Sequence, residues 1–219
     1  AELMDASLFS LFTATFVTFF VLIDAIGVAP VFATLTARGS ARYRRTMAIK
    51  SVFVAALIIY AFAFGGAWLL DAMHISIDAF RAAGGVLLFL IALDMVFEKR
   101  TERREGRAED VMAADDTPDD PDDVSVFPLG IPMIAGPGTI ASAMFFMSDV
   151  AGWGERAMIM LALGANLLLC LVIFLAAGPI VRAMGESVAG ALTRILGVIL
   201  AALSVQLLID GIKGAFGLG

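Results

Sequence analysis

The sequence has 219 residues, of which 60% are hydrophobic and 16% are charged, whereas soluble domains average about 45–50% apolar and about 25% charged residues. Its uncharged stretches exclude a soluble globular fold, because one core cannot bury them all, and they predict helices that face lipid. The formal net charge of −6, without basic stripes that carry interleaved aromatic residues, argues against nucleic acid as a partner.

Six uncharged stretches approach the roughly 20 residues that a membrane-spanning helix needs. They do not alternate polar and apolar residues as the strands of a membrane barrel would. The sequence therefore predicts an all-α membrane protein with six transmembrane helices. The stretches are 6–23 (continuing past Asp24 to 37), 51–70, 82–93 (continuing past Asp94 to 97), 124–148, 157–181 and 195–209.

The basic residues predict how these helices are oriented, because Lys and Arg concentrate in cytoplasmic loops. With the N-terminus outside, twelve of the 15 basic residues fall in inner segments, and only Arg81, Arg156 and Lys213 fall outside. We therefore expect both chain ends outside and the acidic linker, residues 99–124, in the cytoplasm. Residues 109–123 of this linker have little to bury, which predicts disorder.

The linker separates two halves of three helices each, residues 1–98 and 125–219. Three spans per half make any internal duplication inverted across the membrane. Aligning Phe20 with Phe127 also aligns Pro30 with Pro137, which favours two inverted three-helix repeats with broken first helices. The alternative is a chance match between segments rich in Leu and Ala.

Clusters of Pro and Gly in residues 24–32 and 127–140 predict these breaks, because proline removes an amide donor and glycine disfavours a helix interior. Non-helical backbone is tolerated in a membrane only where protein covers it or where it lines a watery cavity. A helix that restarts after a break offers free amides to a carboxylate, and the carbonyls before it can hold a cation. The alternative is that the prolines only kink packed helices.

The second cluster reads Phe127-Pro128-Leu129-Gly130-Ile131-Pro132 and continues from Ile134 through Gly136-Pro137-Gly138-Thr139 to Ile140. With the first cluster, it resembles the MarC family of small prokaryotic inner-membrane proteins, which are related to amino-acid exporters of the lysine-exporter type. The likeness covers nearly all spans, although Ala25 departs from the family pattern. The resemblance implies six spans, residence in the plasma (inner) membrane and transport of small neutral amino acids.

We predict a substrate site between the two broken helices. Asp24 opens the first break, where it can hold a proton or Na⁺ or face a substrate ammonium group. The alternative role for Asp24 is a cap on the segment that follows. The predicted substrate-binding residues are Asp24, Gly27, Pro30, Phe32, Pro132, Gly136, Pro137, Gly138 and Thr139.

Three further polar residues are candidates for ion coupling or for lining the path, because a polar group inside a membrane helix needs a partner or a purpose. Asp94 is one, with an interfacial ion pair to Lys99 or Arg100 as the alternative. Asn166 and Gln206 are the others, with hydrogen bonds between packed helices as the alternative.

The function that these observations favour is a secondary transporter whose partners are the lipid bilayer and a small-molecule substrate. The alternatives are a structural or regulatory membrane protein without transport, and a narrow channel. The sequence contains no metal-binding cluster, no Ser–His–Asp set and no phosphate loop. It therefore predicts no enzyme, no catalytic or metal-ligating residue and no cofactor beyond a coupling H⁺ or Na⁺, and it does not indicate an oligomeric state.

Overall fold

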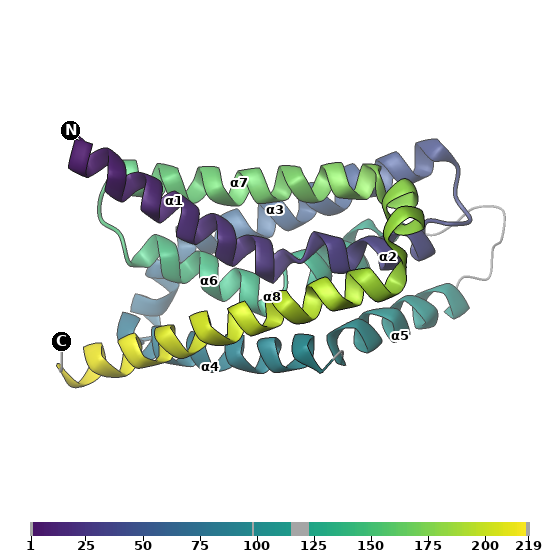
Figure 1. The fold of residues 1–219 in the computed structure, drawn as a ribbon. Helices are drawn as coiled ribbons and strands as arrows, with labels where there is room; N and C mark the ends of the chain where they lie inside the picture. The colour runs from purple at the N-terminus through teal and green to yellow at the C-terminus, as the bar shows by residue number, and fades with distance from the viewer. Residues whose placement is uncertain (1, 98, 115–122, 218–219) are drawn as a thin grey trace.

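Every regular element is a helix in residues 2–97, 99–114 and 123–217, which are the residues described by this computed structural model (Figure 1). The all-α prediction is confirmed. In chain order the elements are α1 (Glu2–Ile23), α2 (Ala25–Leu35), α3 (Ala41–Ala72), α4 (Ile77–Val96), α5 (Lys99–Ala114), the irregular segment η1 (Ser125–Ile134), α6 (Pro137–Ser148), α7 (Trp153–Leu175) and α8 (Ala177–Phe216).

Five helical stretches are long and apolar enough to cross a membrane, and a bent pair raises the number to six. The bent pair is η1 with α6, which meet at 58°. The five unbent stretches contain 29, 32, 20, 23 and 29 residues, against the roughly 20 that a bilayer requires. They are Ser7–Leu35, Ala41–Ala72, Ile77–Val96, Trp153–Leu175 and Val188–Phe216.

The first interruption is a single residue. Asp24 has left-handed backbone angles, φ 48° and ψ 52°, a region in which Asp and Asn are enriched among non-glycine residues. Its amide still donates to the Phe20 carbonyl, and its carbonyl still accepts from Val28. Helix α2 therefore continues almost directly from α1, and together they form one span.

The second interruption is wider. Phe127 and Ile131 have extended backbone angles, and each precedes a proline, which disfavours helical angles in the residue before it. Gly130 is buried, and a Cβ atom there would lie 2.9 Å from the Ser125 carbonyl oxygen. Six of the ten residues of η1 are buried, whereas Phe127 and Ile131, where the backbone is extended, are 55% and 40% exposed.

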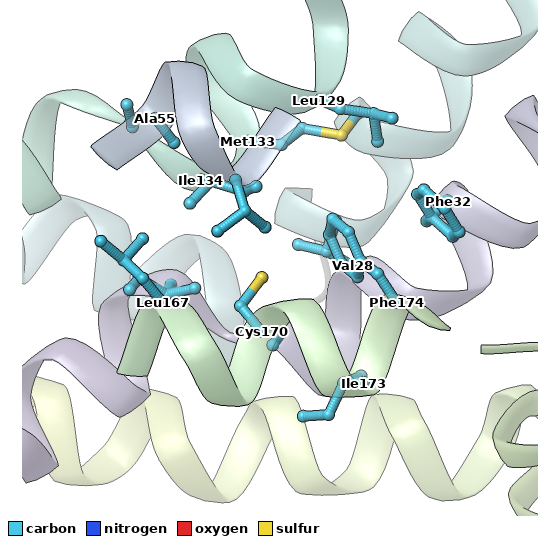
Figure 2. Packing of buried hydrophobic residues seen from close by; sticks show 14 of the residues in the cluster. Val28, Phe32, Ala55, Leu129, Met133, Ile134, Leu167, Cys170, Ile173 and Phe174 are labelled. Carbon is cyan, nitrogen blue, oxygen red and sulfur yellow. The ribbon is translucent and has the colours of Figure 1, made fainter. Parts of the chain in front are cut away.

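Apolar side chains of α2, α3, η1 and α7 form the main core (Figure 2). The rings of Phe32 and Phe174 stack with centroids 4.6 Å apart, and Cys170 is fully buried near Leu167 and Ile134. This core fixes α7 against the first broken span and against the irregular segment η1.

Helices α4 and α8 lie side by side along their length (Figure 1). Small residues allow this approach: a Cβ atom at Gly85 would lie 2.8 Å from the Ser204 carbonyl oxygen, and one at Gly211 would lie 2.5 Å from the Ala82 amide nitrogen. The third spans of the two halves therefore pack backbone against backbone.

The start of α1 and the end of α8 lie at one end of the bundle, whereas α5 and the turn between α2 and α3 lie at the other (Figure 1). This arrangement agrees with both chain ends being on one side of the membrane. Which side faces the cytoplasm stays a prediction.

The linker differs from its predicted disorder. Residues 109–114 belong to helix α5, because α5 is amphipathic and places Arg104 and Ala108 in buried positions against the bundle. Residues 115–122 of that prediction lie outside the described residues, and Asp123, its last residue, pairs with Lys50.

Candidate functional site

A buried ion pair joins the first break to the linker helix. Arg104 Nη1 of α5 donates to Asp24 Oδ2 at 2.9 Å, and the two side chains are 5% and 0% exposed. The Thr193 hydroxyl of α8 lies 3.4 Å from both carboxylate oxygens. Asp24 thus connects three elements that are distant in the sequence.

Asp24 also caps α2, because its Oδ1 accepts a hydrogen bond from the Gly27 amide at 3.2 Å. A Cβ atom at Gly27 would lie 2.4 Å from Asp24 Oδ2. Glycine at this position therefore leaves room for the carboxylate that holds Arg104.

A second arginine of α5 holds the same helix to α4. Arg103 Nη1 pairs with Asp94 Oδ2, and the Asp94 side chain is 25% exposed. The sequence predicted Lys99 or Arg100 as the partner. Arg103, in the second turn of α5, takes this place instead.

The remaining amino group of Arg104 has no hydrogen-bond partner among the described residues, although its Nη2 atom is buried. A guanidinium group carries five donors in a fixed plane. Leaving a buried donor unpaired costs about 1–3 kcal/mol, and more for a charged group. This atom therefore keeps a donor available to a ligand or to water.

Arg104 lines a cavity of about 260 Å³. The cavity walls come from α1, α4, α5, η1 and the start of α6, and their charged groups are three arginines and one aspartate. The lining residues are Leu22, Ile91, Asp94, Arg103, Arg104, Arg107, Pro132, Met133, Gly136, Pro137, Gly138 and Thr139.

The start of α6 forms one wall of this cavity. Gly136 precedes the helix without a side-chain cap, and Pro137 occupies the first turn. The amides of a first helical turn have no acceptor within the helix, and the helix dipole makes this end positive. Gly138 also allows close packing, since a Cβ atom there would lie 2.6 Å from Ile91 Cδ1.

The cavity brings together only part of the predicted site. Pro132, the run from Gly136 to Thr139 and Asp94 all line it. Asp24 does not line the cavity, but it pairs with Arg104, which does. The Gly27 amide donates to Asp24. Pro30 lies within α2, and Phe32 lines a different cavity at the end of α2.

The two remaining candidates lie away from this cavity. Asn166 is buried and donates to the carbonyls of Phe16 and Ala162, both at 3.0 Å, so it joins α7 to α1. Gln206 donates to Asp210 Oδ1 at 2.9 Å on an exposed face of α8. Neither residue lines the cavity that contains Arg104.

The residue that sequence reasoning missed is Arg104, because it lies in a charged linker that the sequence predicts to be cytoplasmic and solvent-exposed. The available signal was arginine at positions 100, 103, 104 and 107, a spacing that gathers charge on one side of a helix. Within the described ranges, no group of three or more His, Cys, Asp or Glu residues is placed to hold a metal ion.

Comparison with known proteins gives a family match over almost the whole chain. Residues 9–216 match the model described as "MarC family integral membrane protein". A UPF0056 membrane protein of Methanocaldococcus jannaschii is 36% identical over 207 residues, covering 93% of this chain and 97% of that protein.

Further relatives come from bacteria. UPF0056 membrane proteins of Bacillus subtilis (YvbG) and Escherichia coli K12 (YhcE) are 32% and 30% identical, covering 95% of this chain in each case and 97% and 94% of those proteins. No solved structure matches this chain. With its multiple membrane-spanning helices, the chain belongs to the MarC family of integral membrane proteins.

Proposed function

We propose that the protein is a secondary transporter of the plasma membrane that carries small neutral amino acids or similar small metabolites with a carboxylate group. The observation that carries this proposal is the buried, unpartnered Nη2 atom of Arg104 in a cavity that also contains the start of α6. Arginine binds carboxylates through parallel hydrogen bonds, and helix N-termini bind anions through free amides.

The size and charge of the cavity support a small carboxylate as the substrate. Its volume of about 260 Å³ is below the roughly 300–1,000 Å³ of pockets for drug-sized ligands. Arg103 pairs with Asp94 and Arg104 pairs with Asp24, so the third arginine, Arg107, leaves the described lining with an excess of positive charge. Asp94 supplies the carboxylate for a substrate ammonium group, which would compete with Arg103.

We assign ion coupling to Asp24. Its carboxylate holds Arg104 by a buried ion pair, so a proton on Asp24 would weaken that pair and free Arg104 for the substrate. Buried pairs are sensitive to the loss of one charge, because the remaining charge is left uncompensated. Proton binding and substrate binding would thereby be linked.

Access to the cavity would involve α5, which is held by Arg103 to Asp94 and by Arg104 to Asp24. Movement of α5 would open the cavity toward the end of the bundle where α5 lies. The proposed inverted repeats would suit such a mechanism, because transporters of this type rock one repeat against the other. The interruption in the first span of each half and the close packing of α4 with α8 support this part of the proposal.

Counterflow in proteoliposomes tests the proposal. We expect vesicles preloaded with unlabelled alanine to take up labelled alanine transiently above equilibrium, which a channel cannot do. The double variant Asp24→Asn with Arg104→Gln removes both buried charges together, and we expect it to remain folded but to lose counterflow. Arg42→Gln, at an exposed arginine of the same end of the bundle, is the matched control.

Three results would reject parts of this proposal. Counterflow that is unchanged in the folded double variant would exclude Arg104 as the carboxylate ligand. Equilibration of label without a transient excess would favour a channel. Absence of flux for a panel of small amino acids and other small carboxylates would favour a structural or regulatory role.

A further inference from the structure

A second, larger cavity lies at the end of the bundle where α2 ends and α3 begins. Its volume is about 630 Å³, and it is lined by the ends of α2 and α7 and the starts of α3 and α8. Phe32 and Phe174, which stack on each other, form part of its wall. It shares no lining residue with the cavity that contains Arg104.

Three arginines give this cavity a positive lining. Arg44 and Arg45 come from the first turns of α3, and Arg182 comes from the second turn of α8. All three are exposed, and among the described side chains none of them forms an ion pair. No acidic residue lines the cavity.

The start of α8 also lies in this cavity. Ala177 and Gly178 line it, and α8 begins there without a side-chain cap. The ends of α2 and α7 line it as well, and their negative dipole ends offset the positive end of α8. The positive charge therefore comes from the three arginines, whose guanidinium groups form a site for an anion that carries more than one acceptor oxygen.

The position of the cavity distinguishes a lipid from a dissolved anion. It lies where the candidate spans end at Leu35 and Leu175 and where another begins at Ala41, which is the level of lipid head groups. Exposed apolar residues on one side of α7 lead up to it along the membrane-spanning length. They are Leu161, Leu168, Val172 and Leu175, of which Leu175 lines the cavity.

We propose that this cavity binds the head group of an anionic phospholipid, with the phosphate among Arg44, Arg45 and Arg182 and an acyl chain along the exposed side of α7. Basic pockets between helices at the membrane surface are suited to anionic head groups. The site is independent of the transport proposal, because none of its lining residues is among the hydrogen-bond or ion-pair partners given for Asp24 and Arg104 in the described structure.

Native mass spectrometry and thermal melting of the purified full chain test this assignment, with phosphatidylglycerol as the probe and phosphatidylcholine of the same acyl chains as the neutral comparison. We expect retained phosphatidylglycerol and a raised melting temperature with that lipid only. In the double variant Arg44→Gln with Arg182→Gln, the affinity for phosphatidylglycerol should fall about 25-fold, because each arginine contributes roughly a fivefold factor.

The double variant Arg38→Gln with Arg42→Gln is the matched control, because it removes equal charge from exposed residues of the same end that do not line the cavity. The variant Arg44→Lys with Arg182→Lys keeps the charge and should retain most of the binding. Equal losses in the two glutamine variants would overturn the site, as would unchanged binding in the cavity variant. Equal stabilisation by glycerol 3-phosphate would overturn the assignment to a lipid.

Discussion

Asp24 illustrates how one side chain serves two roles, of which the sequence indicated only the cap. It caps α2 through the Gly27 amide and also pairs with Arg104 of α5. Both roles use the same carboxylate, because its two oxygens accept from different directions. Capping could be read locally from a carboxylate before a helix, whereas the ion pair required α5 to be placed.

The buried pair predicts strong coupling between its two members. Asp24→Asn or Arg104→Gln alone should destabilise the protein by about 3–5 kcal/mol, because each leaves one buried charge uncompensated. The free energy of unfolding of the double variant should fall by much less than the sum of the two single-variant losses. Thermal melting in detergent and a double-mutant cycle measure this, and additive losses would show that the two groups do not interact.

Asp123 predicts a pH dependence outside the membrane-spanning segments. Burial raises the pKa of its carboxyl group, but hydrogen bonds from Ser125 and Lys50 outweigh this effect and hold the pKa below its usual value of 3.8. A lowered pKa in the folded state means that the stabilisation is present above about pH 3.8 and is lost as the pH falls through the folded value.

The Lys50–Asp123 pair connects α3 to the residues before η1, and its side chains are 52% and 48% exposed. Exposed pairs contribute at most about 1 kcal/mol. Asp123→Asn should therefore lower the melting temperature slightly at pH 7, and the difference from wild type should vanish at acidic pH. A difference that persists below the folded pKa would assign the effect to packing instead of charge.

Among the elements, the contact between α4 and α8 depends on which of two adjacent glycines faces the partner helix. The sequence contains Gly84 and Gly85 next to each other, and it does not distinguish them. In the structure Gly84 has no atom within 4 Å of an added Cβ, whereas Gly85 lies against the backbone of Ser204 and Leu208. Only one member of the pair is therefore required for contact between the helices.

This difference gives a paired test. Gly85→Ala should destabilise the protein by about 1–3 kcal/mol, because the backbone of α8 cannot move aside as a flexible side chain would. Gly84→Ala should be neutral or stabilise by up to about 1 kcal/mol, because alanine is the better helix former. The melting temperatures of the two variants measure the effect, and equal values would show that α4 and α8 do not pack through Gly85.

At the scale of the whole molecule, the structure separates two ends of the bundle. The α6–α7 turn lies at the end with the start of α1 and the end of α8, and the α2–α3 turn lies at the opposite end (Figure 1). The distribution of basic residues predicts that the second end is cytoplasmic. This orientation would place the proposed lipid site in the cytoplasmic leaflet.

Cysteine accessibility tests the orientation, because the one native cysteine, Cys170, is buried and can be replaced by Ala. In that background, Ala151→Cys should react with a membrane-impermeant maleimide on intact cells. Arg38→Cys should react only after the membrane is opened. The opposite pattern would invert the topology and place the proposed lipid site in the outer leaflet.

Local composition determined much of this protein without any knowledge of its tertiary structure. Apolar length predicted the membrane-spanning helices, and the Pro and Gly clusters marked the positions of Asp24 and of η1. The two Pro- and Gly-rich clusters also indicated the family, which the match over residues 9–216 shows. These properties are readable because each depends on residues that are neighbours along the chain.

Tertiary structure alone decided which of these residues meet. Arg104 is 80 positions from Asp24, and Thr193 is 169 positions from it. Their contact depends on how α5 and α8 dock against the first broken span, which no local pattern specifies. A cavity is likewise defined by the packing of distant elements. This is why the start of α6 and Arg104 of the linker helix line one cavity, whereas Asn166 and Gln206 do not line it.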